Sequence, residues 1–374
     1  MKVLFAIDSV FQLMIAVNMR LTIYKEDDAD IVIYNSTMNA DSYAERLRET
    51  RCFGKVFLAE TPLTYCGHGY TIKQKIPKYL IYLKSLVNPE YVIKSICSDF
   101  CDNYDVFLFN GVGALPECIY NAISKRNDSV KCYRFEDSYL SYTQEYGSVK
   151  GKLRIILENI ASLWGRKKLE ENVSGYYFSE PGLVNYDFKY PILQSEKFSR
   201  TNNALKKTLN HVFALDKLND DYHEKYVFFE CGDAFFFNNN DDLRFIDKLV
   251  ELVGTDNILI KRHPRIKENR FKNKGVHIAS GSSVPWELIQ LNIHMEDKVF
   301  ITTKSAAAIT SEVYFGDKCS AILLYKGING EQGDISANFE KYMVDFRNKS
   351  NNGFWLPESI DEFVSLINLL EEGK

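Results

Sequence analysis

The chain has 374 residues, of which 45% are hydrophobic and 26% are charged. This length and composition are typical of two globular domains, and they exclude a disordered chain and a small disulfide-stabilised fold. Its 46 Lys and Arg stand against 50 Asp and Glu, which gives a formal net charge of −4. Because there is no excess of positive charge, we expect no nucleic-acid partner.

Cysteine usage and hydropathy point to a cytoplasmic protein. Several of the eight cysteines lie in apolar strand-like runs, where a thiol behaves as a small hydrophobe. Cys97 and Cys101 form a close pair, but no second pair or His cluster accompanies them, so we predict no zinc site. Asp8 interrupts the N-terminal apolar run, and no uncharged stretch reaches the roughly 18 residues of a membrane-spanning helix.

In the first half of the chain, apolar runs alternate with segments of helical period. This alternation is typical of βα units around a parallel sheet. We expect residues 1–190 to form an N-terminal Rossmann-like domain and residues 191–224 to form a linker with one or two helices. The predicted strands are 3–7, 29–35, 55–60, 105–111, 131–137 and 175–180, and the predicted helices are 11–21 and 116–126.

The second half repeats the pattern, so residues 225–374 are expected to form a C-terminal Rossmann-like domain. The fold class is therefore α/β, with two doubly wound domains facing across a cleft. Neither half contains a GxGxxG fingerprint or a P-loop. Ser359, with Glu362 three residues later, predicts the start of a C-terminal helix. The predicted strands are 225–231, 257–264, 275–280, 298–303 and 319–325, and the other predicted helices are 242–254, 284–292 and 305–316.

Residues 150–168 have a helical apolar stripe between two basic ends. The pattern predicts a helix that packs on its own domain or on a second copy in a homodimer. The alternative is an interfacial helix that seats the protein peripherally on the inner face of an anionic membrane. The stripe consists of Leu153, Ile156, Leu157, Ile160, Leu163 and Trp164.

Ligands of doubly wound sheets bind where strands end, and the first polar motif in such a place is Glu136-Asp137-Ser138. Consecutive side chains at a strand end point in opposite directions, so one carboxylate can enter the cleft as a general base. The alternative is that Asp137 or Ser138 caps the following turn. Asp28-Ala29-Asp30 is also acidic, but we interpret it as a solvated loop before a strand.

The second motif, Lys261-Arg262-His263-Pro264-Arg265, follows the apolar run at 257–260 in the strand predicted at 257–264. Pro264 restricts His263 to extended geometry and thus holds the imidazole at a sharp exit from the strand. The cations beside it suit a phosphate, whose charge would raise the pKa of the imidazole and let it donate a proton. The alternative is a solvated surface histidine.

The third motif is Thr303-Lys304-Ser305, where a strand ends and an Ala-rich helix is predicted to begin. Hydroxyl donors and a helix N-terminus together suit an anion, although Ser305 is also a plain candidate for the helix N-cap. Before it lies Pro285-Trp286-Glu287. Glu287 would either accept from ribose hydroxyls or complement the dipole of its own helix.

These motifs, in this order, resemble those of bacterial sialyltransferases of GT-B architecture. The resemblance is closest to the lipooligosaccharide sialyltransferases of glycosyltransferase family 52 and looser to the bacterial polysialyltransferases. Those families share an acidic Asp/Glu-Asp-Gly motif, a His-Pro motif and a Ser/Thr-rich phosphate motif. The resemblance spans roughly residues 130–315, with two departures: Ser138 replaces the usual Gly, and Ala306 stands where a second hydroxyl is expected.

The resemblance implies an inverting transfer of sialic acid from CMP-sialic acid to a galactose-terminated cell-surface glycan, such as lipooligosaccharide or capsular polysaccharide. Asp137 would be the general base and His263 the acid that assists the leaving phosphate. No metal and no cofactor besides the donor substrate is expected. The residues implied for the nucleotide and its phosphate are Lys261, Pro264, Glu287, Thr303, Lys304 and Ser305, and the accessory residues are Glu136, Ser138 and Arg265.

Two other functions remain open from the sequence. One is another GT-B glycosyltransferase or an epimerase that uses a different nucleotide sugar. The other is a non-catalytic protein that binds a glycan or a nucleotide, which the presence of a candidate base and a candidate acid in different domains disfavours. The sequence does not distinguish sialic acid from a related keto-acid sugar.

Overall fold

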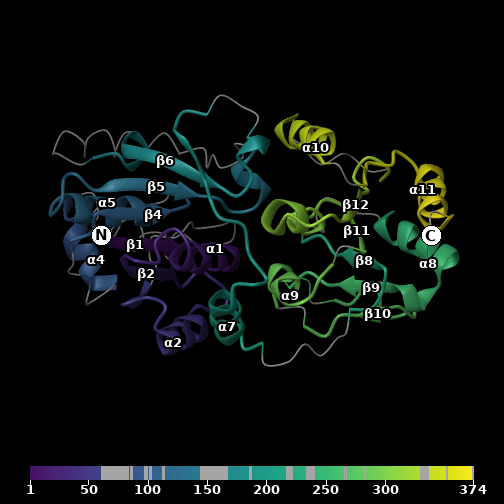
Figure 1. Cartoon of the computed structure of the whole chain (residues 1–374), viewed down its shortest axis with the longest axis horizontal. Coiled ribbons are helices and arrows are strands. Elements are labelled where there is room, and N and C mark those ends of the chain that lie inside the picture. The colour runs from purple at the N-terminus through teal and green to yellow at the C-terminus, as the bar shows by residue number, and fades with distance from the viewer. Residues whose placement is uncertain are drawn as a thin grey trace. The chain divides into compact units, whose positions relative to one another are not determined.

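The computed structural model of the chain divides into two compact units (Figure 1). Unit 1 comprises Met1–Glu196 and Asn202–Ala214, and unit 2 comprises Lys197–Thr201 and Leu215–Lys374. The residues that the structure describes are 1–59, 84, 87–96, 100, 103–111, 114–143, 167–184, 188–215, 222–232, 241–264, 266, 268–281, 284–295, 297–328, 337–350 and 353–372.

Unit 1 is built on a seven-stranded sheet in the order β3-β2-β1-β4-β5-β6-β7. Each neighbouring pair is parallel. The order reverses between β1 and β4, which is the point where ligands of doubly wound sheets bind. The strands are β1 (Lys2–Ile7), β2 (Asp28–Tyr34), β3 (Val56–Ala59), β4 (Val106–Phe109), β5 (Lys131–Phe135), β6 (Val173–Phe178) and β7 (Ile192–Gln194).

Side chains alternate along β1, so the sheet of unit 1 is apolar on both faces. Leu4 and Ala6 share a buried cluster with residues of α4 and α5, whereas Phe5 packs edge-on against Tyr24 and Phe53. Helix α7 packs beside α1 and α2 (Figure 1). The helices are α1 (Val10–Leu21), α2 (Ala40–Thr50), α4 (Pro89–Ile96), α5 (Ala114–Ser124) and α7 (Asn203–Val212), with short 3₁₀ turns η1 (Tyr139–Ser141), η2 (Leu169–Asn172) and η3 (Pro181–Leu183).

Two features of unit 1 differ from the sequence interpretation. The interpretation of Asp28-Ala29-Asp30 as a solvated loop is wrong, because these residues begin β2. The side chain of Asp30 is buried. Its carboxylate accepts hydrogen bonds from the Tyr104 hydroxyl at 2.7 Å and from the Lys55 backbone N–H at 2.7 Å. The segment predicted as the linker, 191–224, contains β7 and α7, which both belong to unit 1.

Unit 2 has a six-stranded sheet in the order β10-β9-β8-β11-β12-β13, and its pairings are also parallel. The order reverses between β8 and β11, as it does between β1 and β4. The fold class predicted from the sequence, two doubly wound α/β domains, is confirmed for each unit. The strands are β8 (Tyr226–Phe229), β9 (Ile258–Lys261), β10 (His277–Ile278), β11 (Val299–Thr302), β12 (Ser320–Leu323) and β13 (Phe354–Trp355).

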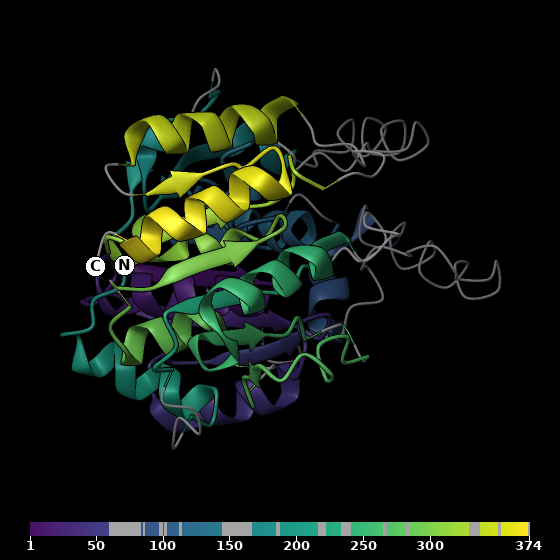
Figure 2. The same cartoon turned by 90° about the vertical axis from the view of Figure 1, so that its right-hand side faces the viewer.

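Helices α8 and α11 pack side by side in unit 2 (Figure 2), and Phe245 meets Phe363 between them with ring centroids 5.3 Å apart. The N-cap predicted for α11 is confirmed, since Ser359 Oγ accepts from the Glu362 N–H at 3.1 Å. The helices are α8 (Asp241–Val253), α9 (Trp286–Asn292), α10 (Ala337–Lys349) and α11 (Ile360–Glu372), and η5 (Thr255–Asn257) is a 3₁₀ turn.

The prediction of a continuous helix over 305–316 is wrong. The chain forms a 3₁₀ turn, η6 (Ala306–Ala308), followed by a π-helical turn, η7 (Ser311–Phe315). Thr310 Oγ1 donates to the Ala307 carbonyl at 2.9 Å, and such a side-chain bond competes with the backbone for helical hydrogen bonding. A helix dipole at Ser305 is accordingly much weaker than the sequence predicted.

Some calls from the sequence lie outside the described residues. These are the Cys97 and Cys101 pair, Arg265 and residues 150–166 of the amphipathic segment. Among the described helices, none combines the length and the apolar character needed to cross a membrane.

Candidate active site

Asp137 lies two residues beyond the end of β5 and is held by side chains from the start of α1. Its carboxylate accepts from Gln12 Nε2 at 2.9 Å and from Ser9 Oγ at 3.3 Å. Its backbone N–H donates to Ser141 Oγ at 2.7 Å. The carboxylate is half-buried, so it is oriented by protein groups and still accessible, as a general base requires.

Glu136 points the other way and is fully buried. Its carboxylate accepts from the Ser179 backbone N–H at 2.7 Å and from the hydroxyls of Ser179 and Tyr142. These bonds join the ends of β5 and β6. The two consecutive acids therefore bond to different parts of unit 1, as the opposite orientation expected from the sequence requires.

Ser138 has a backbone conformation that favours glycine. Its φ of 58° and ψ of −167° fall in a region that is essentially restricted to Gly and costs of order 1–3 kcal/mol for other residues. Ser138 is the N-cap residue of η1 but makes no capping hydrogen bond with its side chain. The backbone at Ser138 therefore has a conformation that a glycine would adopt at no such cost.

Asp8, which the sequence analysis did not select, follows β1 beside the reversal of strand order in unit 1. Its backbone N–H donates to Gln12 Oε1 at 3.0 Å. The side chain is exposed, yet the pKa of its carboxyl is raised, first by the desolvation that the surrounding protein imposes and second by the Asp137 carboxylate. Two carboxylates thus share this sheet edge. The signal for Asp8 was its place directly after a strand and before a helix.

His263 lies two residues beyond β9, and its imidazole fills the space beside Gly232. A Cβ atom at position 232 would lie 2.5 Å from His263 Cε1 and 2.6 Å from Nε2. The His263 backbone N–H donates to Glu230 Oε2 at 3.1 Å, and its carbonyl accepts from the Ile266 N–H at 3.1 Å. The ring is half-buried. Pro264, which follows it, is exposed.

Glu230, which the sequence analysis also missed, is the centre of a buried charged network. Its side chain is fully buried, 3.3 Å from Arg270 Nε and 3.9 Å from Arg262 Nε. Arg270 in turn donates to both carboxylate oxygens of Asp242, at 3.0 and 2.7 Å. Burial raises the pKa of Glu230, and the two arginines oppose that rise. The sequence signal that could have identified Glu230 is its position directly after β8.

Lys261 ends β9 and is buried. Its Nζ donates to the Gly281 carbonyl, so the ammonium group is bonded inside the protein. Arg262 NH2 donates to the carbonyls of Ile266 and Glu268, at 2.8 Å each. These bonds fix the loop that carries His263.

The third predicted motif follows β11, which pairs with β8. Thr302 Oγ1 donates to the Phe229 carbonyl at 3.0 Å and accepts from the Ser305 N–H at 3.2 Å. Ser305 is the N-cap of η6 and accepts from the Ala307 N–H at 3.3 Å. Thr303 is buried, and Lys304 Nζ lies 4.8 Å from the centroid of the Phe339 ring.

Glu287 stands in the first turn of α9 and is half-buried. The preceding Trp286 packs against Phe229 and Phe300, with ring centroids 4.8 and 5.7 Å away. Because these two aromatic residues belong to β8 and β11, Trp286 fixes the start of α9 against the strands where the order reverses. The contacts of Trp286 therefore hold Glu287 near β8 and β11.

Within unit 2, the structure brings His263 and Ser305 to one edge of the sheet, because β9 and β11 both flank β8. A cationic loop and a hydroxyl at the carboxyl ends of two parallel strands that flank the same central strand suit a phosphate group. Asp137 and Asp8 occupy the corresponding edge of the sheet of unit 1. Each unit thus places its candidate residues where doubly wound sheets bind ligands.

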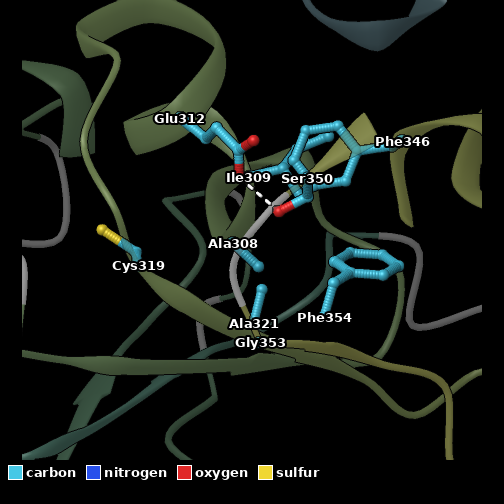
Figure 3. A pocket seen from close by; sticks show the side chains of 9 residues that line it. All are labelled: Ala308, Ile309, Glu312, Cys319, Ala321, Phe346, Ser350, Gly353 and Phe354. Atoms are coloured by element: carbon cyan, nitrogen blue, oxygen red, sulfur yellow. Dashed lines mark hydrogen bonds between the residues drawn. The ribbon is translucent and has the colours of Figure 1, made fainter. Parts of the chain in front are cut away.

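A small pocket and buried thiols lie elsewhere in the described part of the chain. Apolar residues and the pair Glu312 and Ser350 line this pocket between η6, η7, β12 and α10 (Figure 3), and Ser350 Oγ donates to Glu312 at 2.8 Å. Burial raises the pKa of the Cys52 thiol to about 11 and of the Cys132 thiol to about 12, which makes them poor nucleophiles at neutral pH. The described residues contain no group of three or more His, Cys, Asp or Glu arranged to hold a metal ion.

Comparison with known proteins identifies the fold but not a family. No protein-family model matches the chain, and no curated protein is significantly similar to it in sequence. Among solved structures, the glycotransferase of kitacinnamycin aligns with a TM-score of 0.57 and 10% identity, over 100% of this chain and 90% of that one. An α/β-galactoside α-2,3-sialyltransferase from the luminous marine bacterium Photobacterium phosphoreum aligns with a TM-score of 0.55 and 9% identity, over 96% and 99%.

A third similar structure is a protein of Arabidopsis thaliana in complex with UDP-L-rhamnose, with a TM-score of 0.52 and 13% identity over 99% of this chain and 93% of that one. The alignments extend over nearly the whole chain in all three cases. The fold is therefore that of the GT-B glycosyltransferases.

Proposed function

We propose that this chain is a GT-B glycosyltransferase that moves sialic acid from CMP-sialic acid to a hydroxyl of a galactose-terminated glycan, with inversion at the anomeric carbon. The observation that carries the proposal is the pair of oriented side chains at equivalent sheet edges. Asp137 stands beyond β5 in unit 1 and His263 stands beyond β9 in unit 2. The motif resemblance to family 52 sialyltransferases supports the choice of donor.

In this mechanism, Asp137 accepts the proton of the acceptor hydroxyl while the oxygen of that hydroxyl attacks the anomeric carbon of sialic acid. The bond from that carbon to the phosphate oxygen of CMP breaks, and the electron pair leaves with the phosphate. His263 donates a proton or a hydrogen bond to that oxygen as its charge develops. The single displacement inverts the configuration.

Other residues of unit 2 would bind the nucleotide. Ser305 can accept from the Ala307 N–H and still donate its own proton to a phosphate oxygen. Glu287 would accept from the ribose hydroxyls. Lys261 and Thr303 are buried and would shape the loop, whereas Lys304 and Pro264 would border the phosphate. Metal independence and a cytoplasmic, peripherally membrane-bound protein remain predictions.

A different nucleotide sugar is the alternative, because a structure with the same fold holds UDP-L-rhamnose. The test is thermal stabilisation by CMP, UDP and other nucleotides, followed by product analysis with CMP-sialic acid. We expect CMP to raise the melting temperature and UDP to leave it unchanged, since only a ligand that binds the native state stabilises it. Stabilisation by UDP alone would reject the sialyl donor and retain the glycosyltransferase assignment.

The candidate acid gives the second test. His263→Ala should lower kcat by about 10²- to 10⁴-fold, the usual contribution of general acid–base catalysis, while CMP still binds. Equal turnover by the variant and the wild-type protein would remove His263 from the mechanism.

A further inference from the structure

The carboxyl end of β8 contacts the segment that carries His263 at three points. The Glu230 backbone N–H donates to the Lys261 carbonyl at 3.0 Å, and the Glu230 carboxylate accepts from the His263 N–H at 3.1 Å. Two residues later, Gly232 lies directly against the imidazole. The strand end of β8 therefore fixes both the backbone and the ring of His263.

The His263 ring, and not the backbone conformation at position 232, explains why Gly232 stands there. Its φ lies outside the left-handed region that favours glycine, so an alanine could adopt the same backbone conformation. Its Cβ, however, would approach three ring atoms of His263, the nearest at 2.5 Å. Because real Cβ contacts are longer than this, an alanine would displace the imidazole.

Burying the charged network around Glu230 costs free energy, because its ionised groups lose their hydration. The Glu230 side chain has no exposed surface, and its partners Arg262, Arg270 and Asp242 are mostly buried. Burying ion pairs often stabilises a protein no better than apolar packing does. What the network does supply is a fixed acceptor for the His263 N–H, with Arg270 anchored to α8 through Asp242.

We propose that Glu230 and Gly232 are positioning residues for His263: Glu230 fixes the backbone that presents the imidazole, and Gly232 leaves the space in which the ring lies. The inference rests on the proposed function, in which that ring assists the leaving phosphate. A displacement of a catalytic group by about 1 Å costs roughly 10²-fold in rate, so the contact at Gly232 controls turnover more than donor binding.

The test is a double-mutant cycle between Gly232→Ala and His263→Ala. Gly232→Ala should lower kcat at least about tenfold and change the donor KM by less than about threefold. In the His263→Ala background, the same substitution should cause no further loss, because the ring that it displaces is gone. Glu230→Leu, which removes the acceptor for the His263 N–H, should behave in the same way, whereas Glu230→Gln keeps an oxygen acceptor and should retain most of the turnover. Cys231→Ala, on the same segment, adds no atom beside the ring and serves as the control.

A second readout does not depend on turnover. The Cε1–H resonance of His263, assigned by comparison with His263→Ala, should shift in Gly232→Ala and stay in place in Cys231→Ala. An unchanged resonance, or kinetic losses that multiply with those of His263→Ala, would overturn the inference. If the wild-type protein transfers nothing from CMP-sialic acid, that donor is rejected, and the cycle is measured with the nucleotide sugar that binds.

Discussion

Asp137 accepts a 2.9 Å hydrogen bond from the side-chain amide of Gln12, which ties the carboxylate beyond β5 to the first turn of α1. Gln12 is buried and also accepts from the Asp8 N–H. One amide side chain therefore links the ends of β1 and β5. Because a bonded carboxylate keeps one geometry, an acceptor hydroxyl in the proposed mechanism would meet Asp137 without a cost for ordering the carboxylate.

The first prediction concerns Asp137 as the base. Asn keeps the size and much of the hydrogen bonding of Asp but cannot take a proton. Asp137→Asn should fold normally, retain CMP binding and lose transfer by about 10²-fold or more. Initial rates at saturating donor, together with calorimetric binding of CMP, measure both effects.

Glu136→Gln is the matched control. Gln brings an NH₂ group toward the hydroxyls of Ser179 and Tyr142, so the buried bonding at Glu136 is disrupted. An unsatisfied buried polar group costs about 1–3 kcal/mol, and we expect a loss of stability with transfer retained by the folded protein. If Glu136→Gln abolishes transfer and Asp137→Asn does not, the base is Glu136 and not Asp137.

The second prediction is that Asp8→Asn stabilises the protein at neutral pH. The pKa of Asp8 is raised above its ordinary value of 3.8 by desolvation and by Asp137. The ionised carboxylate is thus less favourable in the folded state than in the unfolded chain. The stability that Asp8 contributes is present below its unfolded pKa and lost as the pH rises through its folded pKa.

The gain from Asp8→Asn should consequently be largest at about pH 7–8 and shrink as the pH falls toward about 4. Urea unfolding of both proteins across this range measures it. A gain that grows at low pH, or a loss of stability at neutral pH, would show that Asp8 makes a favourable ionic contact instead.

The third prediction separates two roles of Ser305. Ser305→Ala removes an N-cap, which costs about 0.5–2 kcal/mol. If Ser305 binds the phosphate as proposed, the variant also loses a hydroxyl donor, which should weaken donor affinity about tenfold or more. Thermal unfolding and the donor KM report the two effects separately. Ser305→Thr keeps the hydroxyl and should restore both. A change in stability with an unchanged KM would leave Ser305 as a cap and nothing more.

Much of the fold could be predicted because long apolar strands carry a strong local signal. β1 and β2 are nearly all buried, and their apolar runs mark them plainly. β7 (Ile192–Gln194) and β13 (Phe354–Trp355) were missed, because two or three residues at a sheet edge give no period to detect. The helix at 305–316 failed for another reason: the Thr310 hydroxyl bonds to the Ala307 carbonyl within the segment and to Gln290 Oε1, which only the tertiary structure brings near.

The site was partly predictable for a related reason. Asp137 and His263 belong to short motifs after strands, which sequence reasoning can select. Asp8 and Glu230 also follow strands, but as single acidic residues they do not stand out from many others. Their significance comes from partners distant in sequence, such as Arg270, which lies 40 residues after Glu230.

The last prediction concerns the strained backbone at Ser138. Its φ of 58° and ψ of −167° cost a residue with a Cβ atom of order 1–3 kcal/mol. Glycine relieves that cost but loses more conformational entropy on folding, by roughly 0.5–1 kcal/mol. Ser138→Gly should therefore stabilise unit 1 by about 1–2 kcal/mol in urea unfolding. Ser138→Ala retains the Cβ atom and, since the Ser138 side chain makes no capping bond, should leave the stability nearly unchanged. Equal stability of the Gly and Ala variants would mean that the backbone relaxes at this position and that no strain is stored beside Asp137.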